Sequence, residues 1–260
     1  MQIIYLNTWY AELRSPLACF LSDNITNTDI FCFQESDKRV RRFCRSILTN
    51  FQELAADKKL PNNEVFSQAI YIKNDIAITG ADVLLKDLPD AGLAIHADLD
   101  YNGSKIAICN THGISYDSTD DKLDTPGRIK QSRAILDNYR HAERPVVIGG
   151  DFNALPEADC IKMFTRAGYQ DLIHDYRIPT TRNVNIWKLY PNTPQYFSDY
   201  VFVGKGLKTE SFMVPNDIIS DHQPLIVNVS FLESTQTKPP MATVLPQSQS
   251  SQRSNAIQVQ

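Results

Sequence analysis

The sequence contains no apolar run long enough to cross a bilayer and no pair of cysteines at the spacing of a zinc site. Its five cysteines are scattered, and Cys32 and Cys109 lie in apolar, strand-like runs, so we expect reduced and mostly buried thiols. Met1 leads into such a run without a charged segment and an apolar leader. We therefore expect a soluble, cytoplasmic monomer with no membrane partner.

A strong excess of positive charge is also missing. The chain carries 26 basic and 30 acidic residues, a net charge of −4. Residues 233–260 hold Lys238, Arg253 and Glu233, which leaves −5 for residues 1–232. This charge excludes a general polyanion-binding surface. Nucleic acid stays open as a substrate, because metal-binding carboxylates would account for part of the acidity.

No linker interrupts residues 1–232, and their length suits one large domain with a substantial core. From residue 233 onward the composition shifts to Ser, Gln, Thr and Pro, which cannot form a core. The sequence therefore predicts one domain over residues 1–232 and a disordered tail over residues 233–260.

The most informative segment runs from Val146 to Pro156 and reads VVIGGDFNALP. Its β-branched residues predict a short buried strand, which two glycines end. Glycine permits close backbone approach and unusual dihedral angles, so Asp151 and Asn153 can point into one pocket while Phe152 turns into the core. Alone, this segment fits a solvated turn equally well.

The same pattern recurs along the chain, and the recurrence favours a shared site over isolated surface residues. Apolar runs at 3–6, 30–33 and 106–109 are followed by Asn7, by Gln34-Glu35 and by Asn110-Thr111-His112. Two further acidic motifs precede apolar runs: Ser198-Asp199-Tyr200 and Ser220-Asp221-His222.

This ordered set of motifs resembles the endonuclease/exonuclease/phosphatase superfamily, of the DNase I-like type, over nearly all of residues 1–232. The resemblance implies an α/β fold in four layers, with two mostly antiparallel sheets packed face to face, helices outside, and the site at one edge. The strand-rich pattern interspersed with helices agrees with this fold. The resemblance also implies a metal-dependent phosphohydrolase.

The chemistry of such a reaction suits these residue types. Hydrolysis of a phosphoester needs an in-line water, neutralisation of the equatorial oxygens and help for the departing oxygen. Magnesium prefers oxygen ligands and commonly uses one or two carboxylates. We expect Mg²⁺, with Mn²⁺ as the alternative, to be held by Glu35, with Asn7 beside it and Asp221 completing or water-bridging the shell.

The remaining motif residues receive roles that resemble those at matching positions of the superfamily. His222 is the candidate base or an electrostatic clamp, since an imidazole titrates near neutral pH, and Asp199 orients it. Asp151 positions or deprotonates the attacking water. Asn153 donates to a nonbridging oxygen, and His112 stabilises the pentavalent phosphorus or the leaving group. The division of labour between Asp151 and His222 stays open.

Two arginines are candidate substrate contacts. Arg128 lies near the start of a helix predicted for residues 125–141, where it either supports the site, contacts the substrate or lies on a plain helix face. Arg182 lies in the irregular region 171–195 and is the preferred phosphate contact, with Trp187 able to stack on a base. A packed insertion would explain this region as well.

Other elements follow from periodicity and turn signals. Helices are expected at 15–21, 37–51 and 156–167. Hairpins are expected for 67–73 with 76–85 and for 92–99 with 105–110, and the acidic segment 113–124 is expected to form a mobile loop at the rim of the site.

Short sequence differences from better-defined groups of the superfamily narrow the range of expected substrates. Ala154-Leu155 replaces the aromatic residue and Arg of inositol polyphosphate 5-phosphatases, and Tyr196-Phe197-Ser198 lacks the Arg of abasic-site endonucleases. We therefore expect a compact phosphohydrolase acting on a nucleotide, a nucleic-acid end or another small phosphoester. An abasic-site or single-strand-type nuclease and a non-catalytic binding module are the alternatives.

Overall fold

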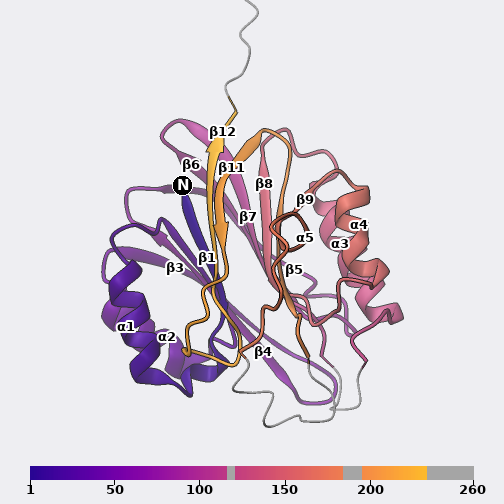
Figure 1. Cartoon of the computed structure of the whole chain (residues 1–260), viewed down its shortest axis with the longest axis horizontal. Helices are drawn as coiled ribbons and strands as arrows, with labels where there is room; N and C mark the ends of the chain where they lie inside the picture. Colours follow the sequence, from indigo (N-terminus) through magenta and orange to yellow (C-terminus); the bar gives the residue numbers. More distant parts are fainter. Residues whose placement is uncertain (116–120, 184–194, 233–260) are drawn as a thin grey trace, which may run out of the picture.

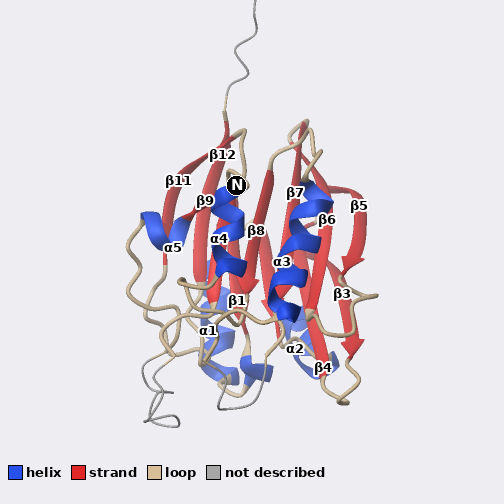
Figure 2. Ribbon diagram, turned by 90° about the vertical axis from the view of Figure 1, so that its right-hand side faces the viewer, coloured by secondary structure: helices blue, strands red, loops and turns tan. Residues whose placement is uncertain are grey.

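The computed structural model describes residues 1–115, 121–183 and 195–232. Within these ranges the chain forms two six-stranded sheets that lie face to face, with helices on their outer faces (Figure 1, Figure 2). The predicted four-layer α/β sandwich is confirmed. The predicted tail at 233–260 lies outside the described residues.

The first sheet has the order β11-β12-β1-β2-β4-β3 and takes strands from both ends of the domain. β1 and β2 are parallel and are joined through α1, while the other neighbours are antiparallel. The elements of this half are β1 (Gln2–Asn7), η1 (Trp9–Ala11), α1 (Arg14–Asn24), β2 (Ile30–Gln34), α2 (Lys38–Ile47), β3 (Phe51–Lys59), β4 (Val65–Lys73), β11 (Leu207–Met213) and β12 (Leu225–Phe231).

The second sheet has the order β5-β6-β7-β8-β10-β9. Its parallel pair is β7 and β8, joined through α3, so the two sheets share one plan of a central parallel pair flanked by antiparallel strands. The elements are β5 (Ala77–Leu84), β6 (Leu93–Tyr101), β7 (Ser104–His112), α3 (Pro126–Tyr139), β8 (Val146–Asp151), α4 (Asp159–Arg166), β9 (Gln170–Asp171), α5 (Leu172–Asp175) and β10 (Asp199–Val203).

The central strands are buried on both faces, which explains why they read as continuous apolar runs. Tyr5 from the first sheet and Ile108 from the second belong to one core cluster between the layers. On the outer face of the first sheet, Leu17 of α1 and Phe43 of α2 share a second cluster with Phe31. No helix among the described residues is long and apolar enough to span a membrane.

The expected hairpin of residues 67–73 with 76–85 is wrong. Both segments are strands, but β4 pairs with β2 and β3 in the first sheet, whereas β5 pairs with β6 in the second. The turn at Asn74-Asp75 carries the chain from one sheet to the other. Turn chemistry marks where a strand ends, but the partner of the next strand is decided by which apolar face it must cover.

Other boundaries also differ. The helix expected at 37–51 ends at Ile47, and a strand the sequence did not reveal, β3, begins at Phe51. β3 lies at the edge of its sheet with a half-exposed, alternating surface, so its polar composition hid it. α1 begins at Arg14, which places Ser15 inside the helix, and α4 begins at Asp159 and not at Pro156. The hairpin of β6 with β7 is confirmed, and its turn places Asn102 and Gly103 at φ of 55° and 82°.

Candidate active site

The candidate site lies at one edge of the sandwich, where the carboxyl ends of the two parallel pairs meet. Asn7 ends β1 opposite Gln34 of β2, and His112 ends β7 opposite Asp151 of β8. The first residue of β10, Asp199, also lies opposite Asp151. Strand register alone therefore brings together motifs that are far apart in the sequence.

Gly149 allows the close approach of the first sheet, and Gly150 allows the close approach of the neighbouring strand β7. A side chain at Gly149 would meet the ring of Tyr5 at 2.7 Å. A side chain at Gly150 would meet the carbonyl oxygen of Thr111 at 2.1 Å, and Gly150 has φ of 123°. The predicted roles of these glycines are confirmed, although β8 runs through them to Asp151 and does not end before them. Phe152 turns into the core as expected.

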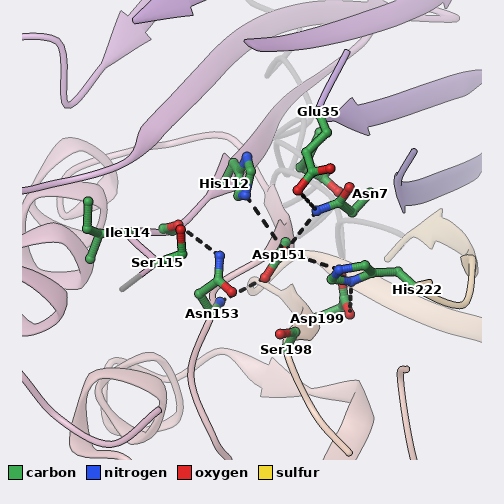
Figure 3. A network of polar contacts seen from close by, with 12 residues as sticks. Asn7, Glu35, His112, Ile114, Ser115, Asp151, Asn153, Ser198, Asp199 and His222 are labelled. Carbon is green, nitrogen blue, oxygen red and sulfur yellow. Dashed lines mark hydrogen bonds and ion pairs between the residues drawn. The ribbon is translucent and has the colours of Figure 1, made fainter. Parts of the chain in front are cut away.

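Asp151 occupies the centre of the polar network (Figure 3). Its Oδ2 accepts a hydrogen bond from Asn7 Nδ2 at 3.0 Å, and its Oδ1 accepts one from the backbone N–H of Asn153 at 2.8 Å. The same Asn7 nitrogen lies 3.1 Å from Oε1 of Glu35. Glu35 and Asn153 both have φ of 51°, a left-handed conformation that non-glycine residues adopt at a cost, often at functional sites.

Glu35 belongs to a group of acids whose negative charges lie close together. Burial, followed by repulsion from Asp221, raises the pKa of Glu35 to about 7. A bound cation would relieve this repulsion, and the available donors are carboxylate and amide oxygens, the set that hard divalent ions prefer. The residues present therefore fit a magnesium or manganese ion.

A second acidic group surrounds His222, which is 2% exposed. Its Nδ1 lies 2.9 Å from both oxygens of Asp199, and its Nε2 lies 3.6 Å from Oδ2 of Asp151. Ligand atoms of Asp151, Asp199 and His222 lie within 4.8 Å of one another, so these residues also could hold a metal ion. Because Asp199 already binds Nδ1 through both oxygens, this group is better suited to orienting the imidazole.

Arg182 contacts the same histidine from the other side. Its guanidinium donates to Asp221 Oδ2 at 2.9 Å and to Nε2 of His222. Burial and Arg182 lower the pKa of His222, but three carboxylates outweigh them and the net shift is upward. In the arrangement described, Nε2 accepts from Arg182, so the ring carries its proton on Nδ1 and donates it to Asp199.

His112 ends β7, next to Asp151 in the second sheet, and Asn153 follows Asp151 by two residues. His112 Nε2 lies 3.8 Å from Asp151 Oδ2, and the ring packs on Phe66 with centroids 4.6 Å apart. Burial lowers the pKa of His112 to about 4, so the ring is neutral at pH 7. The side-chain amide of Asn153 donates to the carbonyl of Gly113 at 3.1 Å.

The structure brings eight of the predicted residues to this edge, together with Arg182, and places Arg128 differently. Arg128 is 1% exposed in α3, where its Nη1 donates to the carbonyl of Leu123 at 2.8 Å. Of the roles weighed for Arg128, this position favours support of the neighbouring loop. Gln131, one turn later, accepts from the backbone N–H groups of Gly92 and Ile114. Trp187 lies outside the described residues.

Lys122 is a site residue that the sequence did not reveal. Its ammonium donates to Ser198 Oγ at 2.7 Å and lies 3.4 Å from Asn153 Oδ1. No motif or spacing marks Lys122, because a single lysine in an acidic segment has the pattern of a solvated loop.

Comparisons with known proteins show which sequences and folds this chain is similar to. The UPF0294 protein of Vibrio cholerae is 28% identical over 131 residues, 50% of this chain and 42% of that protein, so the chain spans less than half of the curated relatives it matches. The mannosyl-6-phosphatase of Bacteroides thetaiotaomicron has a TM-score of 0.70 at 17% identity, over 89% of this chain and 100% of that chain. The human Nocturnin catalytic domain with bound sulfate anion has a TM-score of 0.65 at 18% identity, over 89% and 93%.

At 17% and 18% identity, the similarity to these two structures shows the fold alone. The family model described as Endonuclease/Exonuclease/phosphatase family matches residues 5–222, which include every residue of the site. In this chain, the buried cluster of Asp151, Asp199 and His222 has the residue types of a metal site. The chain belongs to the Endonuclease/Exonuclease/phosphatase family.

Proposed function

We propose that the protein is a divalent-metal-dependent phosphoesterase that hydrolyses a phosphodiester or phosphomonoester by in-line attack of water. The observation that carries this proposal is the network around Asp151, in which the first sheet supplies Asn7 and Glu35 and the second supplies His112 and Asn153. Such a network combines acidic oxygen ligands with neutral hydrogen-bond donors around one central carboxylate.

Glu35 would hold the metal ion, with Asn7 beside it and Asp221 as a direct or water-bridged ligand. When bound, a divalent cation supplies neutralisation of the phosphate oxygens and support for the leaving oxygen. Asn7 fixes the distance between Glu35 and Asp151 by donating to both. Ser220 Oγ donates to the backbone carbonyl of Asn7 at 2.7 Å, which ties the segment carrying Asp221 to the same place.

The attacking water belongs between Asp151 and His222. Burial opposes ionisation of Asp151, but His222, His112 and Lys122 hold its pKa at about 2, so it is a carboxylate at neutral pH and a weak base. Asp151 therefore orients the water by accepting a hydrogen bond. His222 takes the proton on Nε2, while Asp199 holds Nδ1 and stabilises the imidazolium that results.

Arg182, Asn153 and His112 bind the phosphoryl group. Arg182 now donates to Nε2 of His222, so transfer of the guanidinium to a phosphate oxygen frees that nitrogen to accept the proton. Asn153 donates from its amide, and His112, neutral at pH 7, donates from Nε2 toward the reacting oxygens. Binding of the phosphate and activation of the base are thereby coupled.

The substrate we propose is a nucleotide, a nucleic-acid end or another small phosphoester. A net charge of −5 in residues 1–232 does not favour a long polyanion lying across the surface. A phosphatase of a sugar phosphate and a domain with bound sulfate share the fold, which supports a small anionic group in this site.

The test is hydrolysis of bis-p-nitrophenyl phosphate, p-nitrophenyl phosphate, single-stranded DNA, RNA and abasic duplex with magnesium, manganese or EDTA. We expect turnover that requires metal and is lost in Asp151→Ala. Asp137→Ala, on the exposed surface of α3, is the matched control and should keep wild-type activity. Folded, metal-loaded wild type that hydrolyses none of these substrates would contradict the proposal and favour a binding module.

A further inference from the structure

The segment 121–124 is docked against the loop that follows Asp151. The backbone carbonyl of Lys122 accepts from Leu155 N–H at 2.9 Å. The carboxylate of Asp124 accepts from the backbone N–H groups of Asp159 and Cys160 at 2.6 and 2.8 Å, at the start of α4. These contacts hold the described end of the predicted rim loop in place, and they direct Lys122 inward.

The side chain of Lys122 is 6% exposed, which is unusual for a lysine and costly without partners. Its ammonium donates to Ser198 Oγ at 2.7 Å, and Asn153 Oδ1 lies 3.4 Å away. Two site carboxylates, Asp151 and Asp199, are close enough to interact with it electrostatically. Lys122 thus places an ammonium group next to Ser198 and Asn153, close to Asp151 and Asp199.

Ser198 is a rigid anchor for this ammonium. It is fully buried, its N–H donates to Thr181 Oγ1 at 3.1 Å, and its carbonyl accepts from Phe152 N–H at 2.7 Å. Ser198 therefore connects the backbone immediately before Asp199 with the backbone immediately after Asp151. An ammonium held here has little freedom to move relative to the catalytic residues.

The orientation of the Asn153 amide depends on this arrangement. Its Oδ1 faces the Lys122 ammonium, and its Nδ2 donates one hydrogen to the Gly113 carbonyl, which leaves the second hydrogen of Nδ2 for another acceptor. A rotated amide would place Nδ2 against the ammonium and Oδ1 against the Gly113 carbonyl, with two repulsive contacts. Lys122 and Gly113 together therefore allow one orientation.

We propose that Lys122 is a positioning residue of the active site, anchored on Ser198, that holds the Asn153 amide with its nitrogen toward the phosphate. This inference rests on the proposed phosphoesterase function and deepens it. Lys122 acts on the phosphate through Asn153, so its effect depends on the Asn153 amide being present. The lysine comes from a segment that no motif of the family identifies in this sequence.

The test is a double-mutant cycle with Lys122→Met, Asn153→Ala and the double variant, and Lys130→Met on the exposed face of α3 is the matched control. The readouts are kcat/KM for bis-p-nitrophenyl phosphate with magnesium and the Kd of inorganic phosphate from titration calorimetry. We expect each single variant to lose about 10- to 100-fold in both, the worth of a hydrogen bond to a charged group. The double variant should lose no more kcat/KM and phosphate affinity than the more impaired of the two single variants. Lys130→Met should match wild type in both.

The inference would be overturned if the losses of kcat/KM in the two single variants multiply in the double variant. It would also be overturned if Lys122→Met has the same kcat/KM and phosphate Kd as Lys130→Met. If Lys122→Met does not fold, Ser198→Ala removes the anchor and keeps the lysine; wild-type kcat/KM in Ser198→Ala would also reject it. If the wild type has no turnover, the proposed function fails, and phosphate affinity then decides: equal Kd in wild type and Lys122→Met, or no phosphate binding by the wild type, rejects the role of Lys122.

Discussion

Asn7 of the first sheet donates a hydrogen bond from Nδ2 to Oδ2 of Asp151 in the second sheet, at 3.0 Å. The same nitrogen lies 3.1 Å from Glu35 Oε1. One amide therefore sets the separation of the two carboxylates on which the proposed chemistry depends. The site is a property of how the two sheets pack, because neither sheet alone contains both acids.

Asn7→Ala should weaken binding of Mn²⁺ about 10- to 100-fold, the usual effect of losing a residue that orients a metal ligand. The physical reason is that Glu35 and Asp151 then repel each other without a shared donor. Titration calorimetry measures the Kd, and Asn138→Ala on the exposed face of α3 is the matched control. An unchanged Kd in Asn7→Ala would place the metal elsewhere, for example at Asp199 and His222.

Metal binding should release a proton at slightly acidic pH. Burial, followed by the charge of Asp221, raises the pKa of Glu35 to about 7, so below pH 7 the metal-free protein carries a proton that a metal ion must displace. The affinity for Mn²⁺ should therefore rise as the pH increases from 5.5 to 8. Calorimetry in two buffers of different ionisation enthalpy measures the proton count, and Glu35→Gln should show none. A flat affinity over this range would count against Glu35 as a ligand.

The buried imidazole of His112 should make the metal-free protein less stable in acid. Burial lowers its pKa to about 4, while an exposed histidine titrates near 6.5. Between these values the unfolded state binds more protons than the folded state, so this group's contribution to stability is present above pH 6.5 and is lost as the pH falls toward 4. The full difference corresponds to about 3 kcal/mol.

Urea unfolding in EDTA at several pH values tests this effect by comparing wild type with His112→Gln. The difference in free energy of unfolding between the two proteins should rise from pH 4 to pH 6.5 and stay constant above it. A difference independent of pH would mean that His112 does not titrate with a lowered pKa. The comparison cancels the titrating groups that do not interact with His112. Asp151, which does interact with it, has a pKa of about 2 and stays ionised in the folded protein over this pH range.

The sequence predicted that the motif residues gather at one edge because the motifs stand at strand ends, and strand ends are marked locally. Asp151 and Asn153 follow a β-branched run with two glycines, and the register of the strands then brings Asp199 opposite Asp151. The four-layer architecture was implied by the resemblance of these ordered motifs to the superfamily, and the strand-rich pattern agreed with it.

What the sequence could not predict depends on packing between distant segments. The transfer of the chain from β4 to β5 across the sandwich is not marked at Asn74-Asp75, where the turn signal is that of a hairpin. Lys122 enters the site because three backbone contacts of its segment involve residues 155–160, and no local pattern records them. Edge strands such as β3 could not be predicted for a local reason, because their exposed faces carry no apolar pattern.

Residues 85–92 connect β5 to β6 in the second sheet, and Lys58 of the first sheet contacts this crossover. From β3, its ammonium lies 2.7 to 3.0 Å from four backbone carbonyls, those of Leu85, Leu88, Ala91 and Gly92, which share its three hydrogens. Lys58→Met keeps the aliphatic stem but leaves these carbonyls without their donor. We expect the free energy of unfolding to fall by about 2 to 4 kcal/mol, since hydrogen bonds to a charged group are the stronger kind.

Chemical denaturation measures this loss, and Lys59→Met, at the exposed neighbouring position, is the matched control and should stay within about 0.5 kcal/mol of wild type. Gly92 lies so close to the His112 carbonyl that an added Cβ would approach it to 1.9 Å. Loosening the crossover should therefore also lower kcat/KM, although less than a change at Asp151 does. Equal stability of Lys58→Met and Lys59→Met would show that water satisfies the four carbonyls, and that the packing of the two sheets holds the crossover without the lysine.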